Sequence, residues 1–209
     1  MTPERRLETD TDDGMLLIIS GPSGVGKTTI TRGVERAISD SVFSVSATTR
    51  DQTAADVEGV DYRFVSDEAF QAMIDADALL EWAEVFGKRY GTPRAWVEEQ
   101  LARGRLVILE IDVEGAKQVK AKMPEAFGLF VLPPSEEALL ERLRSRRRES
   151  EEQIQARFRE AQREIRVARE CGAYDAFVVN DDLDRAIESA LAQVRRARES
   201  GRKRSAPRP

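Results

Sequence analysis

The feature that most constrains this chain is a glycine-rich segment with a lysine and a threonine at fixed spacing. Residues 21–28 read Gly-Pro-Ser-Gly-Val-Gly-Lys-Thr, the complete G-x-x-x-x-G-K-[ST] pattern. The segment follows Met15 to Ser20, an apolar run typical of a strand buried on both faces, and opens a predicted helix from Lys27 to about Ser39. Strand, loop and helix in this order predict a phosphate-binding loop (P-loop) for a nucleotide.

Glycines let successive backbone N–H groups point at phosphate oxygens, and the following helix adds its positive end. Lys27 supplies a cation for the outer phosphates, and the Thr28 hydroxyl can reach a Mg²⁺ that accompanies ATP. A glycine-rich turn that merely joins strand to helix is the alternative interpretation. The predicted ATP-binding residues here are Gly21, Pro22, Ser23, Gly24, Val25, Gly26, Lys27, Thr28 and Thr29.

The remaining pattern alternates strands with helices. Apolar runs predict strands at 42–47, 106–111, 129–132 and 176–179, and helical patterns occupy 93–103, 113–122, 135–146, 151–170 and 183–198. This alternation predicts an α/β fold, a P-loop NTPase-type parallel sheet flanked by helices. The segment at about 48–92 breaks the rhythm with strand-like pieces at 62–65, 80–85 and 88–90, so we expect an inserted small β-rich lobe.

Composition limits the classes of function. The chain has 209 residues, enough for one domain at 15–198, with a polar tail at 1–14 predicted to be disordered and a basic flexible tail at 199–209. It has no histidine, which excludes imidazole bases and histidine metal sites. No apolar run approaches the roughly 20 residues that span a bilayer, and the single Cys171 requires no oxidising compartment, so a soluble cytoplasmic protein is expected. A net charge of −5 argues against nucleic-acid binding.

Arginines gather after the strand at 129–132. Arg142, Arg144 and Arg146 to Arg148 lead into a helix that carries Arg157. Guanidinium groups suit the charge on a phosphoryl group in transfer, and a closing lid would exclude water, so residues 142–157 form a predicted lid segment. A solvated helical face with i,i+4 Glu–Arg pairs is the alternative. The P-loop alone does not separate a kinase from a GTPase, a motor or a switch, but the N-K-x-D guanine-reading motif of GTPases is absent from the sequence.

Further motifs follow in order along residues 15–198. They are Ser44-Val-Ser-Ala-Thr-Thr-Arg50, Gly59-Val-Asp-Tyr-Arg-Phe-Val65, Glu81-Trp-Ala-Glu-Val-Phe-Gly87, Tyr90-Gly-Thr92, Ile111-Asp-Val-Glu-Gly115, Pro133-Pro-Ser135 and Val179-Asn-Asp-Asp182. With the P-loop they resemble the guanylate kinases, a family of P-loop nucleoside monophosphate kinases. The resemblance implies transfer of the γ-phosphoryl group of ATP to GMP or dGMP, with Mg²⁺ as cofactor.

The resemblance also implies roles for individual residues. Guanine offers adjacent N1–H and N2–H donors that one carboxylate can accept, and Glu81 stands at the family position for that contact. The implied GMP-binding residues are Ser46, Arg50, Tyr62, Glu81, Tyr90, Thr92 and Asp112; Asn180 lies near adenine. The implied catalytic residues are Lys27, Arg50, Asp112, Arg142, Arg146 and Arg157, and Thr28 is the implied metal ligand.

Several positions depart from the family pattern. Thr53 replaces a second phosphate-binding arginine, Asp56 shortens a glutamate, and Glu110 stands where aspartate is common. The first change puts the affinity for GMP in question, because a charge-assisted contact is lost. A P-loop kinase for another small phosphate acceptor therefore stays open. A binding module that recognises a protein through the former GMP pocket also stays open.

Overall fold

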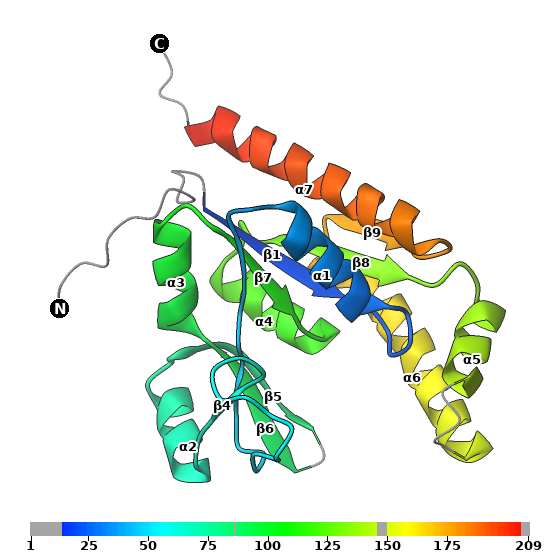
Figure 1. Cartoon of the computed structure of the whole chain (residues 1–209), viewed down its shortest axis with the longest axis horizontal. Helices are drawn as coiled ribbons and strands as arrows, with labels where there is room; N and C mark the ends of the chain where they lie inside the picture. Colours follow the sequence, from blue (N-terminus) through cyan, green and yellow to red (C-terminus); the bar gives the residue numbers. More distant parts are fainter. Residues whose placement is uncertain (1–13, 86, 146–149, 206–209) are drawn as a thin grey trace.

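The computed structural model describes residues 14–85, 87–145 and 150–205. Its centre is a parallel sheet with the strand order β2-β7-β1-β8-β9 (Figure 1). The strands are β1 (Met15–Ser20), β2 (Ser41–Phe43), β7 (Leu106–Glu110), β8 (Phe127–Leu132) and β9 (Ala176–Val179). All of their pairings are parallel, which confirms the predicted α/β class. The carboxyl ends of these strands therefore meet at one edge of the sheet.

Helices cover both faces of this sheet. They are α1 (Lys27–Ala37) and α7 (Leu183–Ser205) on one face, and α3 (Arg94–Ala102), α4 (Val113–Lys122) and α6 (Glu151–Glu170) on the other (Figure 1). Alternate β1 residues explain the two layers: Leu17 packs in the cluster with α1 and α7, whereas Ile18 packs in the cluster with α3 and α4. Both residues are fully buried, as a strand between two helical layers requires.

A second, smaller sheet forms the inserted lobe. Its strands are β3 (Ala47–Thr48), β4 (Arg63–Phe64), β5 (Leu79–Val85) and β6 (Lys88–Pro93), in the order β4-β3-β6-β5. The lobe also contains a helix that the sequence patterns did not predict, α2 (Asp67–Asp75). Ser66 caps it by accepting a hydrogen bond from the Ala69 N–H, and Asp67 and Glu68 lie favourably in its first turn. Residues 47–93 are called the small lobe below.

The predicted single strand at 42–47 was wrong, because the chain changes sheets within it. The N–H of Ser44 still donates to the Ile108 carbonyl of the main sheet (3.0 Å), whereas the Ser46 carbonyl accepts from the Arg63 N–H of the small lobe (2.9 Å). A continuous β-branched pattern describes an extended chain but carries no information about which neighbour it pairs with.

The predicted helix end at Arg198 was also wrong, since α7 continues to Ser205. The added residues contain no proline, and one glycine costs a helix only about 1 kcal/mol. The predicted tail at 199–209 is therefore helical in its first part. Residues 1–13 and 206–209, which hold the rest of both predicted tails, lie outside the described residues.

The predicted lid segment at 142–157 includes the end of α5 (Glu136–Ser145) and the beginning of α6. Leu139 and Leu143 of α5 pack against Ile154 and Ala161 of α6, so the two helices share a small core of their own. A capping box at Ser150 and Gln153 begins α6. Within the described ranges, every helix is too short or too polar to cross a lipid bilayer.

Candidate active site

The P-loop lies between β1 and α1, at the carboxyl edge of the main sheet. Gly24 and Gly26 have φ values of 87° and 94°, in the left-handed region that favours glycine. A Cβ at Gly26 would also lie 2.6 Å from Nδ2 of Asn180. That amide is 6% exposed and donates to the Val25 carbonyl at 2.7 Å. Asn180, which directly follows the edge strand β9, therefore holds the P-loop in place although β8 lies between β9 and β1.

Lys27 is the first residue of α1, and its ammonium turns back over the P-loop. Nζ donates to the Gly21 carbonyl at 2.6 Å and to the Pro22 carbonyl at 3.3 Å. The cation thus lies against the same backbone whose N–H groups can bind phosphate. Thr29, the next residue but one, is exposed on the first turn of α1.

Thr28 and Glu110 form the second contact of the P-loop. The Thr28 hydroxyl donates to Oε1 of Glu110 at 2.7 Å. Glu110 ends β7, where it lies opposite Ile19 of β1. A hydroxyl and a carboxylate are hard oxygen ligands, and Mg²⁺ in proteins is held by one or two such groups together with substrate phosphates. The Thr28 hydroxyl and the Glu110 carboxylate therefore fit the Mg²⁺ ion expected from the sequence. The sequence marked Glu110 as an acidic candidate beside Asp112, at a position where aspartate is common in the family, but did not predict its contact with Thr28.

Glu81 lies at the other end of the site, inside the small lobe. Its carboxylate is buried, and Oε1 accepts a hydrogen bond from the Thr92 hydroxyl at 2.5 Å. Burial raises the pKa of Glu81 to about 7, the negative charge of Asp112 adds to that rise, and the Thr92 hydrogen bond opposes it. A buried carboxylate with one protein donor can accept further N–H groups from a ligand.

Asp112 lies between the P-loop end and the small-lobe end of the site, at the start of α4. It caps α4, with Oδ1 accepting a hydrogen bond from the Gly115 N–H at 2.7 Å. Gly115 in turn lies so close to Glu81 that a Cβ on it would be 2.9 Å from Oε2. The beginning of α4 therefore approaches the buried carboxylate while following directly on β7.

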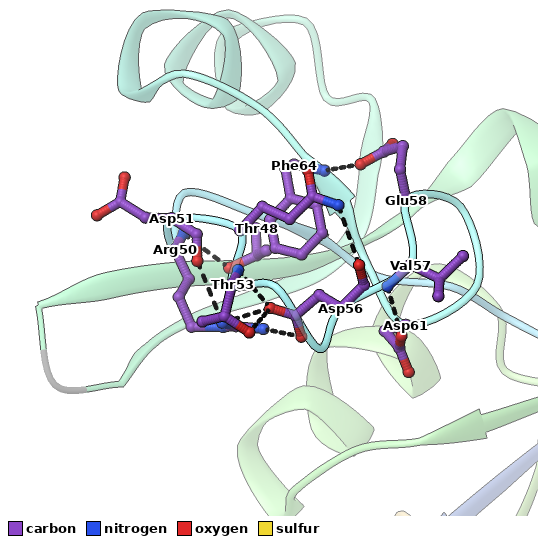
Figure 2. A network of polar contacts seen from close by, with 10 residues as sticks. Thr48, Arg50, Asp51, Thr53, Asp56, Val57, Glu58, Asp61 and Phe64 are labelled. Carbon is purple, nitrogen blue, oxygen red and sulfur yellow. Dashed lines mark hydrogen bonds and ion pairs between the residues drawn. The ribbon is translucent and has the colours of Figure 1, made fainter.

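Three predicted phosphate-binding residues come together on the small lobe. The ring centroids of Tyr62 and Tyr90 are 5.7 Å apart, and the guanidinium carbon of Arg50 lies 5.2 Å from the Tyr62 centroid. Burial raises the pKa of Tyr62, so its phenol stays protonated as a donor. Arg50 also makes a two-point ion pair with Asp56, shown in Figure 2. Ser46 lies just before β3, at the passage between the two sheets.

The lid segment contacts the P-loop through its arginines. Arg157 on α6 donates to the Ser23 hydroxyl, and Arg142 on α5 donates to the Asn180 carbonyl at 2.8 Å. Two of the predicted lid arginines are therefore placed at the P-loop end of the site. Arg146 lies outside the described residues.

The structure adds Glu164, which the sequence patterns did not single out. It lies two turns after Arg157 on α6, on the same face as buried Ala161 and Ala168. Burial raises its pKa to about 7, Lys27 opposes the rise, and the charges of Glu160 and Asp112 add to it. The only sequence signal was an acidic residue on the apolar stripe of a charged helix.

The two ends of the site have complementary chemistry. The P-loop end offers backbone donors, Lys27, the Thr28–Glu110 pair and two arginines, a set suited to a nucleoside polyphosphate. The small-lobe end offers a buried carboxylate for paired N–H donors, and an arginine with two phenols for a phosphate. Such a site can hold two phosphate-bearing ligands with their phosphates toward one another.

Comparisons with known proteins show which family the chain resembles along most of its length. A family model described as guanylate kinase matches residues 13–197. The chain is 46% identical over 181 residues to the guanylate kinase of Caldanaerobacter subterraneus subsp. tengcongensis, covering 87% of this chain and 86% of that protein. It is 49% identical over 192 residues to that of Anaeromyxobacter dehalogenans, covering 90% and 84%. The crystal structure of guanylate kinase from Anaplasma phagocytophilum superposes with a TM-score of 0.67 at 32% identity, covering 91% of this chain and 89% of that one.

Proposed function

This chain belongs to the guanylate kinase family, and we propose that its two-ended site transfers the γ-phosphoryl group of ATP to GMP or dGMP. The products are ADP and GDP or dGDP. The observation that carries this proposal is the pairing of a complete P-loop with the buried Glu81–Thr92 pair in one site. The proposed compartment is the cytoplasm, where the single Cys171 would remain a free thiol.

At the ATP end, backbone N–H groups of Gly21 and of residues 23–26 would hold the β- and γ-phosphates, with Lys27 as their mobile cation. Asn180 would keep the loop in place through its bond to Val25. Thr28 and Glu110 would hold Mg²⁺, which supplies charge neutralisation for the outer phosphates when it is bound.

At the acceptor end, Glu81 would accept the guanine N1–H and N2–H groups. Adenine offers no such pair of donors and would leave a buried carboxylate unpaired, so it is rejected. Thr92 orients Glu81 from the neighbouring strand, and Ser46 is proposed to serve the O6 and N7 edge of guanine. Arg50, Tyr62 and Tyr90 would hold the GMP phosphate.

The transfer itself needs no strong base. An oxygen of the GMP phosphate is already anionic, and it forms the new bond to Pγ while the bond from Pγ to the β–γ bridging oxygen breaks. The electron pair of that broken bond leaves with ADP. Arg142 and Arg157 are proposed to stabilise the equatorial oxygens, with Arg146 expected to join them, and Asp112 to orient the acceptor end.

A coupled assay for ADP release tests the proposal with GMP, dGMP, AMP, CMP, UMP and ribose phosphates as acceptors. Wild-type protein should turn over GMP and dGMP, and Lys27→Ala should lose turnover while keeping its fold by circular dichroism. Undiminished turnover in Lys27→Ala would overturn the mechanism. A preference for AMP or a pyrimidine nucleotide would remove the role given to Glu81. Absence of any ATP turnover would instead support a protein-binding module.

A further inference from the structure

The loop between β3 and β4 surrounds one carboxylate with donors. Asp56 accepts from both terminal nitrogens of Arg50, at 2.7 Å to Oδ1 and 3.0 Å to Oδ2. Its Oδ2 also accepts from the backbone N–H and from the hydroxyl of Thr53, each at 2.7 Å (Figure 2). Arg50 and the two donors of Thr53 hold the pKa of Asp56 well below its usual range.

Arg50 is held in a fixed plane by these contacts. Besides its two bonds to Asp56, NH1 donates to the Asp51 carbonyl at 3.1 Å, and the guanidinium carbon lies 5.4 Å from the Phe64 ring centroid. A guanidinium has five N–H donors, so these three bonds leave two for a ligand phosphate. The side chain of Arg50 is 27% exposed and that of Asp56 is 14% exposed, so a ligand can reach the arginine more easily than its partner.

We propose that Thr53 is a positioning residue for the acceptor phosphate: through Asp56 it fixes the orientation of Arg50, an inference that rests on the proposed function. Thr53 supplies no charge of its own. Its hydroxyl instead locks the rotation of the Asp56 carboxylate, and the two-point ion pair transmits that orientation to Arg50. A pre-oriented arginine binds phosphate with less loss of side-chain freedom than a mobile one.

The expected effect is on GMP binding and not on the transfer step. Thr53→Ala and Thr53→Val both remove the hydroxyl and leave the backbone N–H, so they should raise KM for GMP by roughly fivefold. In both variants, kcat and KM for ATP should stay within about twofold of wild type. Thr53→Ser keeps the hydroxyl and should restore the wild-type KM for GMP.

Gln52→Ala is the matched control. The Gln52 amide donates to the main-chain oxygen of Asp56 at 3.1 Å, in the same loop, without contacting the carboxylate or Arg50. Its loss should leave KM for GMP within about twofold of wild type. An equal rise in Gln52→Ala and Thr53→Ala would overturn the proposal, because any loosening of the loop would then have the same effect.

Two further measurements separate positioning from general damage to the small lobe. The inhibition constant of guanosine, which has no phosphate, should be the same in wild type and Thr53→Ala. In an Asp56→Ala background, Thr53→Ala should add less than twofold to KM for GMP, since Thr53 acts through Asp56. Weaker guanosine binding, a fully additive effect, or an unchanged or lower KM for GMP in Thr53→Ala would each overturn the proposal.

The activity of the wild-type protein with GMP separates failure of the role of Thr53 from failure of the proposed function. Wild-type turnover of GMP together with an unchanged KM in Thr53→Ala overturns only the role of Thr53. Absence of wild-type turnover with GMP overturns the proposed function and, with it, this inference.

Discussion

The hydroxyl of Thr92 donates a 2.5 Å hydrogen bond to Oε1 of Glu81, from β6 to the adjacent strand β5. Both residues are buried, at 1% and 6% exposure respectively. Burial makes the negative charge on the Glu81 carboxylate energetically costly. The hydrogen bond from the Thr92 hydroxyl offsets only part of that cost.

GMP recognition should weaken as pH falls below neutrality. The pKa of Glu81 is raised to about 7, so the free protein carries a neutral acid at lower pH, which cannot accept both guanine donors. The inhibition constant of guanosine should therefore rise about tenfold between pH 8 and pH 6. Guanosine is the better probe because the second phosphate pKa of GMP, near 6, titrates in the same range. A guanosine inhibition constant that is flat over this range would contradict the role of Glu81.

Glu81→Gln should stabilise the protein at pH 8 while abolishing its use of GMP. The folded pKa of Glu81 lies above its usual value of 4.5, so the folded state binds the proton more tightly than the unfolded state between those values. Stability contributed by the protonated form is complete below pH 4.5 and is lost as pH rises through about 7. Glutamine keeps an acceptor for Thr92 without the charge, so the free energy of unfolding should rise by about 3 kcal/mol at pH 8.

Urea unfolding of both proteins at pH 5.5 and pH 8 measures this effect. The difference between variant and wild type should be larger at pH 8 than at pH 5.5, because the wild-type carboxyl is mostly protonated in the folded state at the lower pH. A Glu81→Gln protein that is less stable than wild type at pH 8 would show that the buried charge is not a net cost.

The Thr28–Glu110 pair should set the requirement for Mg²⁺. Glu110→Gln removes the charge at 2.7 Å from the Thr28 hydroxyl, so the Mg²⁺ concentration for half-maximal rate should rise by roughly tenfold. Glu114→Gln is the control, since that carboxylate is exposed on α4 and pairs with Lys117. Titration of the initial rate with MgCl₂ at fixed ATP and GMP provides the measurement. Equal shifts in the two variants would assign the effect to net charge alone.

Asp40 and Arg198 should contribute more to stability than any exposed ion pair among the described residues. Their side chains are 12% and 13% exposed, and two bonds of 2.5 and 3.0 Å join α7 to the segment between α1 and β2. Asp40→Ala would leave a buried guanidinium without this partner and should lower the free energy of unfolding by about 3 kcal/mol, with kcat unchanged.

The pair between Arg163 and Glu160 provides the comparison, because its side chains are 69% and 57% exposed. Glu160→Ala should change the free energy of unfolding by less than about 0.5 kcal/mol. Thermal and urea unfolding of both variants would test the contrast, and equal losses would show that burial of the Asp40–Arg198 pair is unimportant.

Local patterns predicted much of the fold. The bounds of β1, β9, α4 and α6 agree with the predicted ranges, because each is set by its own periodicity and caps. The prediction of one strand at 42–47 was wrong because local periodicity does not specify the pairing partner. Extended residues there pair with β7 first and with β4 and β6 later, and only the neighbouring chain distinguishes the two.

The sequence by itself determined the P-loop, since glycine geometry, Lys27 and Thr28 act within one strand–loop–helix unit. It also determined, through the order of its motifs, the family to which the chain belongs. Only the tertiary structure decided that Thr28 meets Glu110, that Glu81 is buried beside Thr92, and that Thr53 reaches Arg50 through Asp56. Side-chain contacts and burial depend on which distant segments pack together, and a pKa follows from that packing.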